Sequence, residues 1–556
     1  MERQLKLRSS VKSYRFWKPI RFGSQGWLGL LFGCLIALLG CTPPMLPPPR
    51  VTISPSPTVT KASTLPTETD KGSAHQPTIT PTSTVSQTQL DLTPYKQAML
   101  PQFATDVDLE AANGVSRYDI LVTVDKASLQ TDTGVRLHGL VQVIYTNNEI
   151  IALDKIYFRL YPNLPGYGGE MAVQQVLVAE QTVTPTLEAD NSALAVPLPM
   201  PLQPHQSLNI TLTYTAVVPI ETVEGYNIFS YSGGTLALAG FYPVIAVYDK
   251  EGWNIPVPPV YGDATYLDVS LYEVTANVPA NMVVVGSGNL LHKAALSDDY
   301  KALTFATGPM RDFYLVMRPD FEVISNTVDG VVINSYYPPD LAKGGKFVLK
   351  YASDALHFYN EHFGPYPYAE FDVVATPTTA GGVEYPGVVV AAEQFYTETG
   401  GYLQHVVGHE VAHQWWYGLV GNNQVTAPWL DEAFTNYSTL LYWQAVEGQA
   451  VADQVTEDFF RAPYQKAKKN GHDHPVAGAV ADFAPEDYGA IVYGKGPLFF
   501  LALQQQVGDD VFYKITQTYY TEYKYKIAQP DDLIDVIERV HGKNITPLYQ
   551  EWIIGQ

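Results

Sequence analysis

Short runs in which apolar and polar residues alternate fill the chain between Ser116 and about Tyr337. They include YDILVTVD, GLVQVIYTN, SLNITLTYTAVV and GVVINSYY, each bounded by Gly, Pro, Asn or Asp. A period of two residues is typical of strands that bury one face, and no amphipathic helical pattern interrupts these runs. We therefore expect residues 113–338 to form one all-β domain.

The pattern changes after this β-rich region. Apolar residues recur at helical spacing in KFVLKYASDALHFYNEHFG, which ends at Gly364, a typical helix stop. One strand is predicted in PYPYAEFDVVATP, and another, opened by glycine, in GGVEYPGVVVAA at residues 381–392. From Asp453 onward the pattern is mostly helical. Residues 339–556 are thus expected to form an α+β domain, which makes the chain multidomain.

The first 112 residues show neither pattern. A basic start precedes the apolar run WLGLLFGCLIALLGC, which ends at Cys41 and is short for a membrane span. Its last four residues resemble a bacterial lipobox, which implies a signal peptide over residues 1–41 and lipid attachment to Cys41; the alternative is an uncleaved anchor helix. Residues 42–112 are rich in Pro, Thr and Ser, and we expect a disordered spacer there. In either case the body of the chain is expected outside the cytoplasmic membrane, anchored to it at the cell surface or in the periplasm.

The charge and the cysteine content limit which partners and which metal ligands the chain can have. The formal charge is −22, and because the first 21 residues carry seven Lys or Arg and one Glu, a net −28 remains for the rest of the chain. So acidic a body argues against a nucleic-acid partner. Both cysteines, Cys34 and Cys41, lie near the N-terminus, so a metal site in the folded body must use His, Asp and Glu.

One stretch of the chain contains such a set of His and Glu residues. It reads H-E-x-x-H at His409, Glu410 and His413, and eighteen residues separate His413 from Glu432 in WLDEAF. Two histidines four residues apart share one face of a helix, and two His with one Glu leave zinc an open position, as in catalytic sites. We expect one zinc ion per chain, with Glu410 free to act as a base. The alternative is a pair of packed core histidines. His405, on the same face, is expected to pack or to support, since a third His would close the metal site.

These motifs resemble the gluzincin aminopeptidases, the family that includes alanyl aminopeptidases and leukotriene hydrolase. The resemblance rests on HEVAHQWW, the eighteen-residue gap and WLDEAFTNY. It is supported by GGVEYP at residues 381–386, which resembles the family's G-x-M-E-N element, and by VYGKG at residues 492–496, which resembles its Y-x-K-G element. It extends upstream through YFRLYPN and FYPVIAVYDKEGW. The implied fold is a saddle-like all-β domain followed by a thermolysin-like α+β zinc peptidase domain.

The resemblance implies a zinc-dependent aminopeptidase that releases N-terminal residues from peptides. It assigns zinc to His409, His413 and Glu432, the general base to Glu410, and stabilisation of the oxyanion to Tyr493. Substrate binding falls to the glycine-rich element, with Glu384 on the free α-amino group beside Gly381, Gly382 and Val383. Supporting roles are expected for Asn436, next to the ligands, and for Tyr488, next to Tyr493. Without the resemblance, Tyr493 would be interpreted as packing, Glu384 as a solvated edge residue and Asn436 as a surface amide.

Two departures from the family pattern leave alternatives open. The amine-recognition element reads V-E-Y in place of M-E-N, so a side-chain preference is not implied. The chain also ends about 120 residues after Glu432, which leaves no room for the C-terminal helical domain of many relatives and favours a more open cleft. A zinc endopeptidase or another zinc hydrolase is the first alternative. A catalytically inert surface binding lipoprotein is the second.

Overall fold

The computed structural model describes residues 91–221, 225–397 and 400–555, which belong to one compact unit, Asp91–Gln556. This unit begins with two helices, α2 (Thr93–Gln97) and α3 (Ala104–Ala112), joined by the 3-10 turn η1 (Pro101–Phe103). Tyr95 and Val107 are fully buried in the core that the C-terminal helices also share. The prediction of a spacer is therefore wrong for residues 91–112, whose apolar side chains have a core to enter. The predicted signal peptide and residues 42–90 lie outside the described residues.

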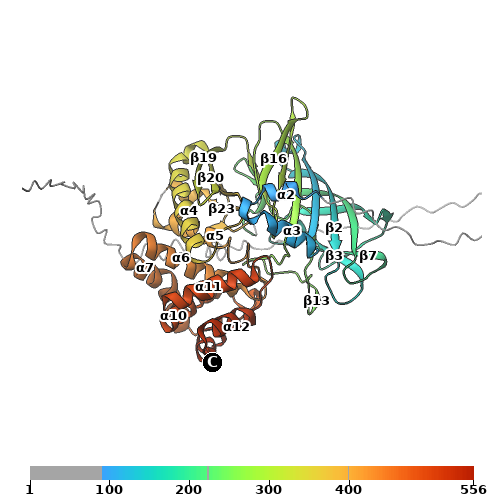
Figure 1. Ribbon diagram of the computed structural model, residues 1–556. Coiled ribbons are helices and arrows are strands. Elements are labelled where there is room, and N and C mark those ends of the chain that lie inside the picture. The colour runs from blue at the N-terminus through green and yellow to red at the C-terminus, as the bar shows by residue number, and fades with distance from the viewer. Residues whose placement is uncertain (1–90, 222–224, 398–399, 556) are drawn as a thin grey trace, which may run out of the picture. The chain divides into compact units, whose positions relative to one another are not determined.

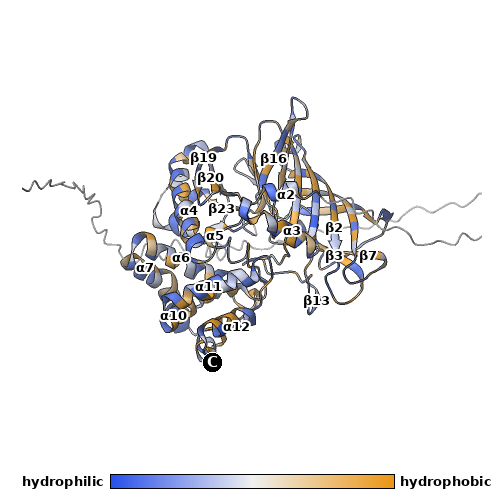
Figure 2. Cartoon of the chain, in the orientation of Figure 1, coloured by the Kyte–Doolittle hydropathy of each residue, from blue (hydrophilic) through white to orange (hydrophobic). Residues whose placement is uncertain are grey.

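The β-rich region is built on an eight-stranded sheet. Its order is β16-β17-β14-β1-β2-β8-β4-β5, and within it only β1 and β14 pair in parallel. The strands are β1 (Ser116–Val124), β2 (Val135–Thr146), β4 (Glu170–Val178), β5 (Gln181–Thr182), β8 (Ser207–Val218), β14 (Ser270–Pro279), β16 (Asn289–Ala295) and β17 (Tyr300–Ala306). Hydrophobic and hydrophilic residues alternate along the long strands (Figure 2), and in β8 every second residue from Ile210 to Val218 is buried. The predicted period-two pattern thus marks the buried face of this sheet.

Two four-stranded sheets complete the region. Their orders are β15-β18-β10-β9 and β11-β3-β7-β6. The strands are β3 (Leu153–Arg159), β6 (Thr186–Glu188), β7 (Ala193–Leu202), β9 (Phe229–Ser232), β10 (Thr235–Leu238), β11 (Val244–Ile245), β15 (Val283–Gly286) and β18 (Leu315–Arg318), with a small hairpin of β12 (Tyr248–Asp249) and β13 (Gly252–Trp253). Between β1 and β18 the described helical segments are only the 3-10 turns η2 (Ser128–Gln130) and η3 (Tyr161–Asn163). The prediction of an all-β first domain is confirmed.

The second region opens with a mixed five-stranded sheet in the order β19-β20-β21-β23-β22. Its strands are β19 (Glu322–Val328), β20 (Val331–Tyr337), β21 (Glu370–Thr376), β22 (Gly382–Val383) and β23 (Val388–Ala392). Two predictions need correction here. The hairpin β19–β20, assigned to the all-β domain, pairs instead with β21, so the boundary lies after β18. Residues 381–392 form two antiparallel strands and a turn, because Gly387 takes a left-handed φ of +77° that reverses the chain.

Helices pack on this sheet and follow it (Figure 1). Helix α4 (Ala342–His362) contacts β19, β20 and α5, and its predicted apolar face supplies Val348, Ala352, Ala355 and Leu356 to the core. The remaining α-helices are α5 (Gly401–Ala412), α6 (Glu432–Glu447), α7 (Gln449–Val455), α8 (Ala462–Lys469), α9 (Pro485–Ala490), α10 (Gly496–Val507), α11 (Asp509–Tyr523), α12 (Pro530–His541) and α13 (Thr546–Tyr549). Short 3-10 turns are η4 (Pro339–Leu341), η5 (Glu393–Thr397), η6 (Pro428–Leu430) and η8 (Val480–Asp482), and π-helical turns are η7 (Thr456–Arg461), η9 (Ile491–Lys495) and η10 (Gln550–Ile554). Among the described residues, no helix is both long and apolar enough to cross a membrane.

Arg311 connects the two regions through hydrogen bonds. Its guanidinium is fully buried and donates three hydrogen bonds to backbone carbonyls, to Leu267 of the first region and to Tyr417 and Lys526 of the second, at 2.7, 2.9 and 3.0 Å. Gly421 lies against it, since a Cβ there would come within 2.2 Å of the guanidinium carbon. The residue that follows the H-E-x-x-H helix by a few positions, Tyr417, is thereby held to the all-β region.

Candidate active site

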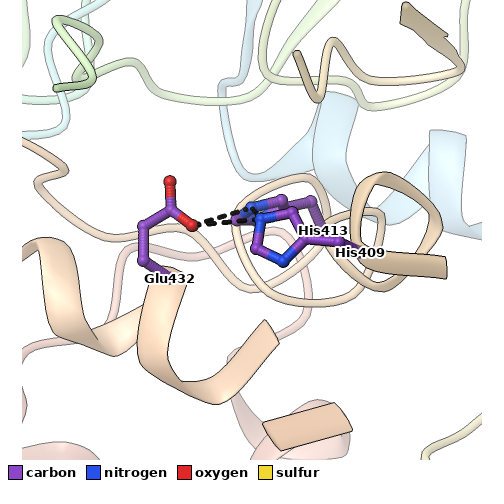
Figure 3. Close-up of side chains that lie close together, drawn as sticks. All are labelled: His409, His413 and Glu432. Atoms are coloured by element: carbon purple, nitrogen blue, oxygen red, sulfur yellow. Dashed lines mark hydrogen bonds and ion pairs between the residues drawn. The ribbon is translucent and has the colours of Figure 1, made fainter. Parts of the chain in front are cut away.

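Three side chains converge between helices α5 and α6 (Figure 3). His409 lies in the last turn of α5, His413 caps that helix, and Glu432 is the first residue of α6. The two Nε2 atoms are 3.1 Å apart, and each lies 3.2–3.3 Å from Oε2 of Glu432. Asp431 caps α6 by accepting a hydrogen bond from the Glu432 backbone amide at 3.0 Å, which fixes the start of the helix. The spacing that the sequence predicted therefore brings these ligand atoms together.

The hydrogen bonds of the two imidazoles determine which ring nitrogen of each can bind a cation. Nδ1 of His409 lies 3.1 Å from Oδ1 of Asn436, and Nδ1 of His413 lies 3.0 Å from the carbonyl of Trp416. Both partners are acceptors, so each Nδ1 carries a proton, and each Nε2 can offer a lone pair to a cation once its own proton is released. Both Nε2 atoms face the buried Oε2 of Glu432.

Such a convergence of acceptors fits a cation. Ligand atoms bound tetrahedrally at about 2.0–2.1 Å from zinc are about 3.3 Å apart, close to the spacing seen here. Burial raises the pKa of Glu432, but His413 and His409 lower it more strongly, so the carboxyl has a pKa well below its usual value and stays ionised. Two nitrogens and one carboxylate oxygen suit zinc and leave room for a fourth ligand.

Glu410 lies beside this centre without joining the three ligand atoms. It is 5% exposed, and one carboxylate oxygen lies within 4.8 Å of ligand atoms of Glu384 and His413. Gly382 of β22 makes room for it, because a Cβ at that position would sit 2.4 Å from Oε1 of Glu410. Burial raises the pKa of Glu410 well above its usual range; His413 opposes this, and Glu384 and Glu432 add to it. The carboxyl group is thus positioned and electrostatically inclined to take up a proton.

Glu384 lies in the turn between β22 and β23 and is 7% exposed. Its Oε1 accepts a hydrogen bond at 2.8 Å from Nε2 of Gln424, which also donates to Oδ2 of Asp431 at 2.8 Å. Gln424 is fully buried and, through its carbonyl, accepts from the hydroxyl of Thr265. Neither Gln424 nor Thr265 belongs to a recognisable sequence motif, although Gln424 lies within the eighteen-residue gap. Together they hold the Glu384 carboxylate in place.

A fourth acid, Asp263, reaches the same place from the segment before β14. Its Oδ2 is buried and receives no hydrogen bond. Burial, followed by the charges of Glu384 and Glu432, raises the pKa of Asp263 well above its usual value. The sequence did not reveal this residue because it lies 121 positions before Glu384, in the region predicted to form the all-β domain. The site therefore holds more carboxyl groups than its basic side chains can balance, which favours cations and ammonium groups.

Tyr493 lies in the π-helical turn η9 and reaches the ligands. Its hydroxyl donates to Oε1 of Glu432 at 2.5 Å, and burial, followed by the Glu432 charge, raises its pKa well above the usual value, so it stays protonated. The ring of Tyr488 packs edge-on against it with centroids 5.7 Å apart. Asn436 donates from Nδ2 to the carbonyl of Tyr493 at 3.2 Å while its Oδ1 holds His409. Asn436 thus connects α6, the first ligand and η9.

The other predicted site residues lie nearby or outside the described residues. Gly381 has only ordinary contacts, since a Cβ there would lie 3.6 Å from its neighbours, and Val383 packs partly buried against the core of the all-β region. His405 stacks on Phe459 with ring centroids 4.3 Å apart, and burial together with the neighbouring His409 lowers its pKa to about 3. It is a neutral packing residue. Cys41 lies outside the described residues.

Comparisons with known proteins agree with this geometry. A family model described as "Peptidase family M1 domain" matches residues 347–552. The chain is 26% identical over 307 residues to aminopeptidase 2 of Candida albicans, and 27% identical over 298 residues to aminopeptidase M1 of Arabidopsis thaliana. These matches cover 51% and 50% of this chain, but only 32% and 33% of the relatives, so the chain spans about a third of their length.

Solved structures show the same fold. The M1 zinc metallopeptidase from Deinococcus radiodurans superimposes with a TM-score of 0.61 at 21% identity, covering 79% of this chain and 94% of the other. A mutant two-domain M1 zinc metallopeptidase bound to L-arginine gives a TM-score of 0.59 at 20% identity, with the same coverage. An all-β region followed by an α+β region is thus a known two-domain architecture.

Proposed function

We propose that this chain is a zinc-dependent aminopeptidase that removes N-terminal residues from peptides, on the premise that residues 347–552 match the family model of the peptidase family M1 domain. The observation that carries the proposal is the convergence of three ligand atoms, from His409, His413 and Glu432, beside further carboxyl groups that include Glu384 and Glu410. The three ligand atoms suit zinc, and the additional carboxyl groups suit the ammonium group at a peptide N-terminus. Relatives named aminopeptidases and zinc metallopeptidases support it.

His409, His413 and Glu432 would hold one zinc ion. When bound, zinc supplies Lewis acidity toward water and the scissile carbonyl. Glu410 is not one of the three ligands, lies against Gly382 and has a raised pKa. It takes a proton from the attacking water and delivers it to the leaving amine.

Tyr493 supplies the hydrogen-bond donor that the tetrahedral oxyanion requires. Its phenol stays protonated, and in the resting protein it donates to Oε1 of Glu432. To act on substrate it exchanges that acceptor for the oxyanion. Tyr488 and Asn436 keep its ring and its backbone in place during the exchange.

Glu384 and Asp263 supply recognition of the chain end. A protonated α-amino group gives the Glu384 carboxylate a counter-charge and gives the buried Oδ2 of Asp263 a hydrogen-bond donor, whereas an internal peptide or an acetylated N-terminus brings no ammonium group. Gln424 fixes the Glu384 carboxylate at 2.8 Å. Since β22 is the edge strand of its sheet, the backbone of Gly382 and Val383 can pair with an extended peptide, with Gly381 at the opening of the strand.

A panel of aminoacyl fluorogenic substrates tests the proposal. We expect hydrolysis that a chelator abolishes and zinc restores, and Glu410→Gln should reduce turnover by at least about a hundredfold while one zinc per chain remains bound. Glu457→Gln, at an exposed glutamate of η7, is the matched control and should keep wild-type turnover. Full activity of Glu410→Gln would refute the assigned base.

We further propose that the enzyme is tethered outside the cytoplasm through a lipid on Cys41. The support is the basic start, the apolar run and the lipobox-like end in residues 1–41, together with the Pro-, Thr- and Ser-rich residues that follow. Labelled palmitate should be incorporated into the wild-type protein and not into Cys41→Ala. Equal incorporation by the two proteins would exclude this anchor.

A further inference from the structure

A second group of metal-ligating side chains lies apart from the three proposed zinc ligands. His472, His474 and Asp487 each offer one ligand atom, and these atoms lie within 4.8 Å of one another. We propose that this cluster is a second cation site, which binds a first-row transition metal ion such as Zn²⁺ more weakly than the proposed catalytic centre does.

The chain builds the cluster from two segments. His472 and His474 stand in the sequence H-D-H after α8, and Asp487 lies in the first turn of α9. Nδ1 of His472 lies 2.8 and 2.9 Å from the two oxygens of Asp487, and Nε2 of His474 lies 3.2 Å from Oδ2. Two imidazole nitrogens thus converge on one carboxylate.

The aspartate between the two histidines is paired with other side chains. Asp473 forms ion pairs with Lys495 at 2.7 Å and with Lys468 at 3.2 Å, and it accepts from the hydroxyl of Tyr464 at 3.2 Å. Lys495 also donates to the carbonyl of His474 at 2.9 Å. These contacts hold the loop in the conformation that presents both imidazoles to Asp487. They also pair the two nearby lysine charges with Asp473, so that the charge of Asp487 is left for a cation.

The donor set indicates which ions fit. Imidazole nitrogens suit Zn²⁺, Ni²⁺ and Cu²⁺, whereas Mg²⁺ and Ca²⁺ prefer oxygen ligands alone. The spacing of 2.8–3.2 Å resembles the 3.1–3.3 Å among His409, His413 and Glu432.

Exposure sets the two sites apart. The side chains of His472 and His474 are 45% and 42% exposed and that of Asp487 is 8% exposed, while the side chains of His409 and His413 are 12% and 1% exposed. Water therefore completes the coordination at the second site and exchanges with the solvent. We infer weaker, reversible binding there. The site lies one residue from Tyr488, whose ring packs against Tyr493, so an ion bound there would fix α9 next to η9.

The test is zinc binding by the purified full chain, measured by equilibrium dialysis with elemental analysis over rising free zinc. The expected result is one zinc per chain at low free zinc and two at high free zinc. The double variant His472→Ala/His474→Ala should bind one at every concentration, and both imidazoles are exposed enough for this variant to fold. Asp487→Asn, which keeps the shape of the side chain, should also lose the second ion.

Two further variants separate the sites. His357→Ala is the matched control, because His357 is an exposed imidazole bonded to a single carboxylate, Asp329, at 3.0 Å, and it should still bind two ions. His409→Ala should lose the tight ion and keep the weak one, so failure of the proposed catalytic centre and failure of the second site give different results. A wild-type chain that binds only one zinc at all concentrations, or a second zinc that survives the double variant, would overturn the proposal and leave a hydrogen-bonded His–Asp cluster.

Discussion

The close approach of a glycine to the proposed base gives the sharpest prediction. A Cβ on Gly382 would lie 2.4 Å from Oε1 and 2.5 Å from Cδ of Glu410, whereas ordinary contacts begin at 3.4 Å. In Gly382→Ala the carboxyl group must therefore move by about 1 Å, a displacement that costs on the order of a hundredfold in rate when it affects a reacting group. The three atoms nearest to this Cβ all belong to Glu410, which is not a zinc ligand, so the metal should stay.

The assay is the turnover of an aminoacyl fluorogenic substrate, with bound zinc and thermal stability measured on the same samples. Gly381→Ala is the neighbouring control, since its Cβ would meet only atoms 3.6 Å away, and it should lose far less activity. Wild-type turnover by Gly382→Ala, with Glu410 still required, would refute the close placement of that carboxyl group. Loss of zinc from Gly382→Ala would show that the substitution acts on the ligands instead.

Three other substitutions follow from the structure. Tyr493→Phe should lower kcat by roughly a hundredfold with little change in bound zinc, because it removes the oxyanion donor, and single-turnover kinetics measure this. Arg311→Met should lower the free energy of unfolding by about 3 kcal/mol or more, because it leaves three buried carbonyls without a donor, and urea unfolding measures this. Burial raises the pKa of Asp312 to about 7, so the folded state binds the proton more tightly than the unfolded state does and stability falls as the pH rises from about 4 to about 7. Asp312→Asn should remove this fall, which is roughly 4 kcal/mol at most, as urea unfolding across that pH range would show.

The ligand set could be predicted from the sequence because its geometry is local. His409 and His413 are one helical turn apart, so helix periodicity places them on one face, and Glu432 begins the next long helix, which returns to that face. The resemblance pointed to Tyr493, whose hydroxyl the structure brings to Glu432. A motif at fixed spacing encodes such a site almost completely.

The features that the sequence did not predict are contacts that depend on the tertiary fold. Asp263 reaches the centre only because the all-β region packs against the α+β region, and Gln424 reaches Glu384 only because the segment before Glu432 folds back on it, so no local pattern encodes either contact. The strands at residues 322–337 alternate like any strand, and only their pairing with β21 places them in the second region. Residues 91–112 follow a Pro- and Thr-rich tract, but Tyr95 and Val107 find a core that composition alone does not reveal.

The most direct test of the account is to incubate the wild-type protein with one peptide in two forms, with a free N-terminus and with an acetylated N-terminus, and to follow the products by mass spectrometry. The account predicts stepwise loss of N-terminal residues from the free peptide only, abolished by a chelator and restored by zinc, because Glu384 and Asp263 require an ammonium group. Cleavage of the acetylated peptide at an equal rate, or at internal bonds, would contradict it and indicate an endopeptidase.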